Sequence, residues 1–112
     1  MSRSALHVGD AALVFAALGD PTRLAVVRRL CSAGPQSIAQ LTDGAHANVT
    51  RQAITKHLVA LAEAGLVRDR KRGRERIFEL EPRRLATARS WIDQISLEWD
   101  SAIDRLRKFV ED

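Results

Sequence analysis

Residues 48–80 read NVTRQAITKHLVALAEAGLVRDRKRGRERIFEL and carry the most informative pattern in the chain. Thr50 is a good N-cap for an amphipathic helix, and Gly65 is a good residue to end it. Two short strands then flank Arg72-Gly73-Arg74, where glycine supplies the positive φ that a tight hairpin needs. The stretch therefore predicts a capped helix followed directly by a β-hairpin.

The hairpin also carries the charge imbalance of the chain. Between Leu66 and Arg76, six basic residues stand against two acidic ones, so this segment has the same net charge, +4, as the whole protein. A merely solvated hairpin does not explain why these cations gather against their mutual repulsion. Ribosomal and membrane-surface proteins are also basic, but they tend to spread their charge. The concentration favours a polyanion partner, and a helix with a basic hairpin is typical of a winged helix-turn-helix on DNA.

The predicted helix has two faces. Ile54, Leu58 and Leu61 fall in a narrow arc at about 100° per residue and are expected in the core. The opposite face and the hairpin supply the candidate DNA-binding residues, which are Thr50, Arg51, Gln52, Thr55, Lys56, Val59, Arg70, Lys71, Arg72 and Arg74. An ordinary solvated helix face is the alternative, and the adjacent basic hairpin weighs against it.

The side chains of this face suit different parts of a duplex. Gln52 matches the edge of adenine, and Arg51 matches guanine. Thr55 and Lys56 fit phosphate contacts, while the outward Val59 suits a thymine methyl group. His57, at the edge of the core arc, is interpreted as structural rather than as a ligand.

The remaining segments complete a mainly α fold with one small β-hairpin, in a single domain over residues 1–112. Asp10 is the predicted N-cap of the first helix, and Pro21 opens a second helix that buries Leu24, Val27 and Leu30. The expected parts are N-terminal helices at 10–32, a helix-turn-helix at 37–65, the hairpin at 66–80 and a long helix at 82–110.

The last helix carries a heptad-like apolar stripe that one small domain covers poorly. We expect its first turns to pack on the chain's own core and the rest to join a second copy. The alternative is that Leu85 to Ile95 serve only the chain's own core. The candidate dimer-interface residues are Leu13, Phe15, Ile92, Ile95, Trp99, Ala102, Ile103, Leu106 and Phe109. A two-fold dimer would present its helices to DNA about 34 Å apart.

Several motifs resemble the ArsR/SmtB family of winged-helix repressors over residues 10–110. They are Leu18-Gly19-Asp20-Pro21-Thr22-Arg23-Leu24, Ala53-Ile54-Thr55-Lys56-His57-Leu58, Glu63-Ala64-Gly65-Leu66-Val67 and the basic hairpin with Leu80-Glu81-Pro82. The resemblance implies a homodimeric repressor on a near-palindromic operator, often released by a small effector. The turn at 43–48 is longer than is usual in that family.

The metal-binding positions of the family are absent. Residues 37–43 hold no cysteine or histidine, and the only histidines, His7, His46 and His57, are too scattered for one site. Cys31 has no partner cysteine and is expected to be a packing residue, with reversible thiol modification as the alternative. We therefore expect no metal and no cofactor, with a carboxylate-only metal site between subunits as the alternative, and the effector is unknown.

Catalysis has no support, because the chain shows no nucleophile–base pair and no phosphate-binding glycine loop. The N-terminus does not resemble a signal peptide, no segment is apolar enough for a membrane, and the single cysteine fits a cytoplasmic location. The sequence predicts a DNA-binding transcriptional regulator, a repressor of its own or neighbouring genes. The alternative is a protein-interaction module that keeps the winged-helix scaffold without reading DNA.

Overall fold

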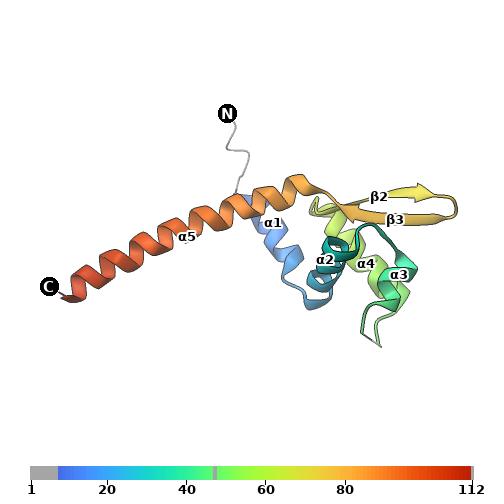
Figure 1. Ribbon diagram of the computed structural model, residues 1–112, viewed down its shortest axis with the longest axis horizontal. Helices are drawn as coiled ribbons and strands as arrows, with labels where there is room; N and C mark the ends of the chain where they lie inside the picture. The colour runs from blue at the N-terminus through green and yellow to red at the C-terminus, as the bar shows by residue number, and fades with distance from the viewer. Residues whose placement is uncertain (1–7, 47, 112) are drawn as a thin grey trace.

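The computed structural model describes residues 8–46 and 48–111. The elements, in order, are α1 (Val8–Leu18), α2 (Pro21–Ala33), β1 (Gln36–Ser37), α3 (Ile38–Asp43), α4 (Arg51–Glu63), β2 (Val67–Arg72), β3 (Glu75–Leu80) and α5 (Pro82–Glu111). Four helices and a small sheet form the body, and α5 leaves it as a single long rod (Figure 1). This arrangement confirms the predicted winged helix-turn-helix with a long C-terminal helix.

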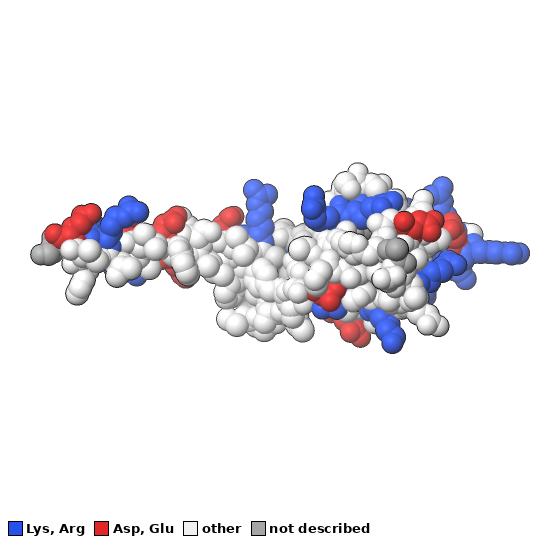
Figure 2. All heavy atoms as spheres, turned by 90° about the horizontal axis from the view of Figure 1, so that it is seen from below, with Lys and Arg blue, Asp and Glu red and all other residues white. Residues whose placement is uncertain are grey.

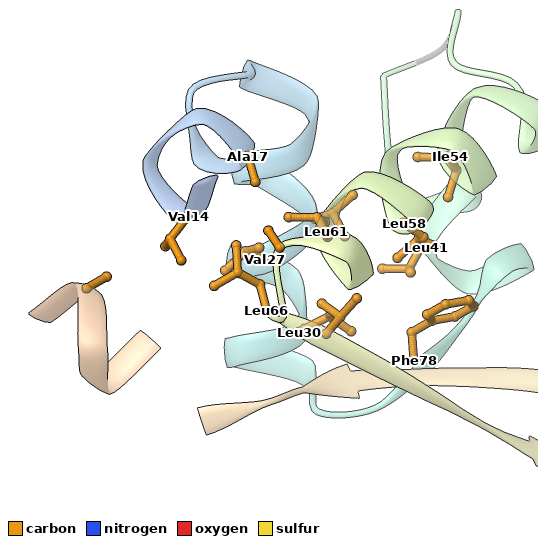
Figure 3. Close-up of a cluster of buried hydrophobic side chains, with 14 residues drawn as sticks. Val14, Ala17, Val27, Leu30, Leu41, Ile54, Leu58, Leu61, Leu66 and Phe78 are labelled. Atoms are coloured by element: carbon orange, nitrogen blue, oxygen red, sulfur yellow. The ribbon is translucent and has the colours of Figure 1, made fainter. Parts of the chain in front are cut away.

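The core is centred on α4. Ile54, Leu58 and Leu61 are fully buried, as their spacing predicts, and they meet residues of α1, α2 and α3 (Figure 3). Phe78 of β3 closes the same cluster from the side of the sheet. Since three positions of α4 fill the centre, the opposite face of this helix is left to solvent.

The junction between α1 and α2 is held by polar contacts that the motif at residues 18–24 encodes. The carboxylate of Asp20 accepts hydrogen bonds from the backbone N–H groups of Thr22 and Arg23 at 2.9 and 3.0 Å, which caps α2. The guanidinium of Arg23 donates to the carbonyls of Ala17 and Ala16 at 2.6 and 3.3 Å, which caps the end of α1. One short segment therefore caps two helices.

This junction predicts a pH-dependent contribution to stability. The backbone N–H of Arg23 holds the pKa of Asp20 below its ordinary value of 3.8. Because the pKa of Asp20 is lowered in the folded state, its stabilising effect is present above the ordinary value of 3.8. The effect is lost as the pH falls from that value through the lowered pKa of the folded state. Asp20→Asn keeps a good cap but cannot titrate. In urea titrations, the free energy of unfolding of the wild type should exceed that of this variant at pH 7, and the difference between them should shrink at pH 3. A difference that stays constant with pH would contradict the assignment.

The sheet has three antiparallel strands in the order β1-β3-β2. The two-residue strand β1, which pairs Gln36 with Phe78 and Ser37 with Ile77, was not predicted. The hydroxyl oxygen of Ser37 accepts from the backbone N–H of Gln40 and so caps α3, and the backbone N–H of Ser37 donates in return to Gln40 Oε1, so the predicted helix start is correct. Gly73 has φ +63° in the turn of the β2–β3 hairpin, hereafter the wing, as predicted.

Three sequence predictions about the N-terminal helices are wrong. Cys31, near the end of α2, was expected to be a packing residue but is exposed. Helix α1 begins at Val8, so Asp10 lies inside its first turn and is not its N-cap. Leu24 is 46% exposed, because α2 turns Val26, Val27 and Leu30 to the core instead. The expected arc had the right period but was rotated slightly about the helix axis.

Helix α5 belongs to the body only at its beginning. Leu85 packs against the core and Ala88 is buried, whereas the residues from Ile92 onward are exposed. The radius of gyration is 17.9 Å, against about 13 Å for a compact domain of this length. The competing prediction, that residues 85–95 serve only the chain's own core, is therefore wrong for Ile92 and Ile95.

Candidate nucleic-acid interface

The solvent face of α4 carries the predicted DNA-binding side chains. Arg51, Gln52, Thr55, Lys56 and Val59 are all exposed on one helix. They project opposite the three buried core residues of the same helix, so the packing that anchors α4 also orients this face. An anchored helix with an exposed polar face has the geometry needed to enter a major groove.

Two threonines of this segment bond to the helix itself. Thr50 Oγ1 accepts from the backbone N–H of Ala53 at 3.0 Å and so caps α4. Thr55 Oγ1 donates to the backbone carbonyl of Arg51 at 2.8 Å. The Thr55 hydroxyl proton is thus already engaged, which makes the predicted phosphate contact of this residue less favourable.

A shallow groove lies between α3 and α4. Its lining is Ile38, Arg51, Gln52, Thr55 and Lys56. Ile38, which is not among the predicted DNA-binding residues, is only partly buried and also lines this groove.

Carboxylates of the wing and of residue 81 engage three of its six cations. Arg68 reaches Glu79 at 2.9 Å and Glu81 at 3.0 Å. Arg70 reaches Glu79 at 3.3 Å, so a phosphate would have to compete with that carboxylate for this predicted contact. Arg76 lies 3.3 Å from Asp69 across the two strands. These ion pairs link β2 to β3 and to residue 81, so the positive charge of the three arginines is balanced locally and is less available to a ligand.

The Arg68–Glu79 pair is electrostatically matched. Its hydrogen bond lowers the pKa of Glu79 and raises the pKa of Arg68, and the nearby Glu81 raises the latter further. Both groups therefore stay ionised around neutral pH. The sequence could not supply this pairing, because it depends on the strand register that sets Arg68 opposite Glu79.

The remaining three cations lie at the wing tip. Among the described residues, Lys71, Arg72 and Arg74 have no carboxylate within 4.0 Å. All three are exposed around Gly73. Figure 2 shows basic side chains gathered at this end of the molecule, some of them beside acidic ones. The tip is therefore where uncompensated positive charge meets solvent.

His57 takes the structural place that its position predicted. Its Nδ1 lies 3.8 Å from the Asp20 carboxylate and 3.5 Å from a guanidinium nitrogen of Arg23. The imidazole thus links α4 to the start of α2. Across residues 8–46 and 48–111, no three His, Cys, Asp or Glu side chains converge in a way that would hold a metal ion.

The predicted interface residues are placed unequally. Leu13 and the apolar positions of the outer part of α5 are exposed, while Phe15 packs partly against its own core and offers less surface to a partner. The exposed positions of α5 form what we call the apolar stripe, which consists of Ile92, Ile95, Trp99, Ala102, Ile103, Leu106 and Phe109. In Figure 2 most charged side chains of the part of α5 that extends from the body lie along one edge, and the opposite edge is almost free of charge. No helix of the described chain is long and apolar enough to cross a membrane.

Known proteins share this architecture. Residues 18–70 match the family described as a helix-turn-helix domain. The chain is 35% identical over 95 residues to HTH-type transcriptional regulator Rv2034 of Mycobacterium tuberculosis. The aligned residues cover 85% of this chain and 83% of that relative. It is 38% identical over 80 residues to the uncharacterized HTH-type transcriptional regulator YuzN of Bacillus subtilis, with 66% and 87% covered.

A solved structure extends the likeness to three dimensions. The ArsR-like transcriptional regulator from Rhodococcus sp. RHA1 is 35% identical and superposes with a TM-score of 0.73, over 90% of this chain and 92% of that one. The relatives and the fold are those of transcriptional regulators. Together with the exposed face of α4 and the basic wing, they show that the chain belongs to the ArsR family of DNA-binding HTH-type transcriptional regulators.

Proposed function

We propose that the protein is a homodimeric, sequence-specific repressor that acts in the cytoplasm on its own or neighbouring genes. The observation that carries this proposal is the combination of α4, with its exposed hydrogen-bonding face, and a wing tip whose cations lack carboxylate partners among the described residues. In this proposal α4 reads base edges and the wing grips the adjacent backbone. A bound dimer would block polymerase at the promoter.

The residues divide into two roles. Arg51 and Gln52, in the first turn of α4, reach guanine and adenine edges in the major groove. Lys56 and the wing-tip cations contact phosphates, and Arg70 joins them only if DNA displaces Glu79. Thr50 contributes mainly by fixing the start of α4.

Dimerisation rests on the apolar stripe. Two copies that pair along α5 would bury residues that a single chain leaves in water. Such a two-fold dimer would set two α4 helices about 34 Å apart, which corresponds to half-sites about 10 base pairs apart on a near-palindromic operator.

Footprinting of DNA upstream of the gene and its neighbours tests the proposal. We expect a protected site with two related half-sites, and binding that weakens steeply as salt rises. Absence of binding to any duplex in dilute buffer would refute it. The protein-interaction module would then be favoured, because it uses the apolar stripe without DNA.

Substitution of Gln52 tests the assignment of base reading. Gln52→Ala should lower affinity for the preferred site by at least about 30-fold and barely change affinity for unrelated DNA, because each of the two subunits loses a bidentate base contact that contributes about 1–3 kcal/mol of discrimination. Lys56→Ala is the matched comparison on the same face, and it should weaken all duplexes alike. Titration of both variants against specific and unrelated duplexes distinguishes these outcomes, and equal behaviour would contradict the assigned roles.

A further inference from the structure

The hydroxyl of Thr55 is turned toward the backbone of its own helix. Its Oγ1 donates to the carbonyl of Arg51 at 2.8 Å, and Thr42 and Thr87 make the same bond to the carbonyls four residues before them. This bond satisfies the hydroxyl within the helix. Because Thr55 is exposed, its methyl group then supplies much of the surface that the residue offers to a partner.

Val59 stands one helical turn further along the same face. It is 52% exposed, although valine gains by burial. Side chains four apart on a helix have Cβ atoms about 5–6 Å from each other, so Thr55 and Val59 present neighbouring methyl groups. Ile38 of α3 lines the groove that Thr55 also lines. An apolar strip thus runs through a face that is otherwise polar and basic.

The major groove offers a matching apolar group. Thymine presents its C5-methyl group there, while the other base edges present hydrogen-bond donors and acceptors. Successive bases of one strand are about 3.4 Å apart along the axis. Two side chains whose Cβ atoms are about 5–6 Å apart can therefore meet two neighbouring base pairs. Neither Thr55 nor Val59 has a long polar side chain that could hydrogen-bond to those donors and acceptors.

We propose that Thr55 and Val59 form a binding subsite for the methyl groups of two neighbouring thymines in each half-site. The inference rests on the proposed function and adds to it the chemical group that is read. It moves Thr55 from phosphate contact to methyl recognition. It also implies that the preferred operator carries thymine, on either strand, at the positions beneath the middle of α4.

The test uses the full-length protein and a random duplex library. After selection, the preferred duplex is remade with uracil in place of thymine, which removes only the methyl groups. Each methyl contact is expected to contribute about 4-fold in affinity, so four contacts in a dimeric site give a loss of roughly 250-fold. Equal affinity for the thymine and uracil duplexes would overturn the inference while leaving the repressor proposal standing.

Matched variants tie the effect to these residues. Thr55→Ser keeps the hydroxyl bond to Arg51 but loses the methyl group, and Val59→Ala removes two methyl groups; each should reduce the ratio of thymine to uracil affinity, and together they should bring it near one. Arg74→Ala should weaken both duplexes and leave the ratio unchanged. If the double variant keeps the wild-type ratio, the methyl groups act elsewhere and the subsite is refuted.

A third duplex separates the methyl group from the rest of the thymine edge. At the sensitive positions, a pair of 5-methylcytosine with guanine carries the methyl group without the thymine oxygen. The subsite predicts that this pair binds better than unmethylated cytosine with guanine, and no difference would overturn it. Failure of the library to yield any preferred duplex would instead refute the proposed function itself.

Discussion

Replacement of Arg72 and Arg74 together by alanine is expected to weaken binding to any duplex by about 1000-fold at about 0.1 M salt. In a dimer this removes four phosphate contacts, and each contact contributes about 0.9 to the slope of log affinity against log salt. The slope should therefore become flatter by about 3 to 4. Base preference should remain, because α4 is untouched. Titrations at several salt concentrations measure both quantities.

The large effect follows from the pairing pattern of the wing. Arg68, Arg70 and Arg76 already face carboxylates at 2.9 to 3.3 Å, so a phosphate must replace an existing partner to gain them. Arg72 and Arg74 give up no carboxylate partner among the described residues. When they contact a phosphate, counterions are released from the DNA, and none of these carboxylate pairs in the protein has to be broken in exchange.

Two controls distinguish this local charge from net charge. Arg105→Ala with Arg107→Ala removes the same charge from the exposed tail of α5, and Arg76→Ala removes a paired cation from the wing itself. Both should lower affinity far less than the wing-tip pair. If the tail variant were as weak as the wing-tip variant, the wing would not grip DNA and long-range electrostatics alone would explain the binding.

Features with local causes could be predicted from the sequence. The caps at Asp20, Ser37 and Thr50 and the positive φ of Gly73 each depend on a few neighbouring residues, and all four are present. The exposed face of α4 could also be predicted, because burial of one helical arc fixes what remains outside.

The features that were missed depend on tertiary contacts. Strand β1 exists because Gln36 pairs with Phe78, more than 40 residues away along the chain, and two residues carry no periodic signal of their own. Glu79 pairs with both Arg68 and Arg70 because of the β2–β3 register, and the count of charges up to Arg76 left this carboxylate out. The rotation of α2 that exposes Leu24 is likewise set by its neighbours and not by its own sequence.

Leu106→Asp is expected to convert the proposed dimer into a monomer without unfolding the chain. Leu106 lies on the apolar stripe and is 61% exposed in the single chain, so the substitution removes little from the chain's own core. In a symmetric dimer each change acts twice. Loss of a buried leucine costs about 1.5–3 kcal/mol per copy, and the carboxylate adds a desolvation cost, so the dimer should weaken by at least about 1000-fold. Sedimentation measures the mass, and circular dichroism should be unchanged.

Leu97→Asp is the control that makes this result specific. Leu97 is equally apolar and 65% exposed, but at about 100° per residue it points away from the apolar stripe on the same helix. We expect this variant to remain dimeric and to bind DNA normally. The Leu106 variant should retain only weak binding to single half-sites, because two linked half-sites raise the effective concentration of the second contact. If both variants stay dimeric, subunits pair through another surface, with α1 the next candidate; if both dissociate, the interface surrounds α5 instead of following one stripe.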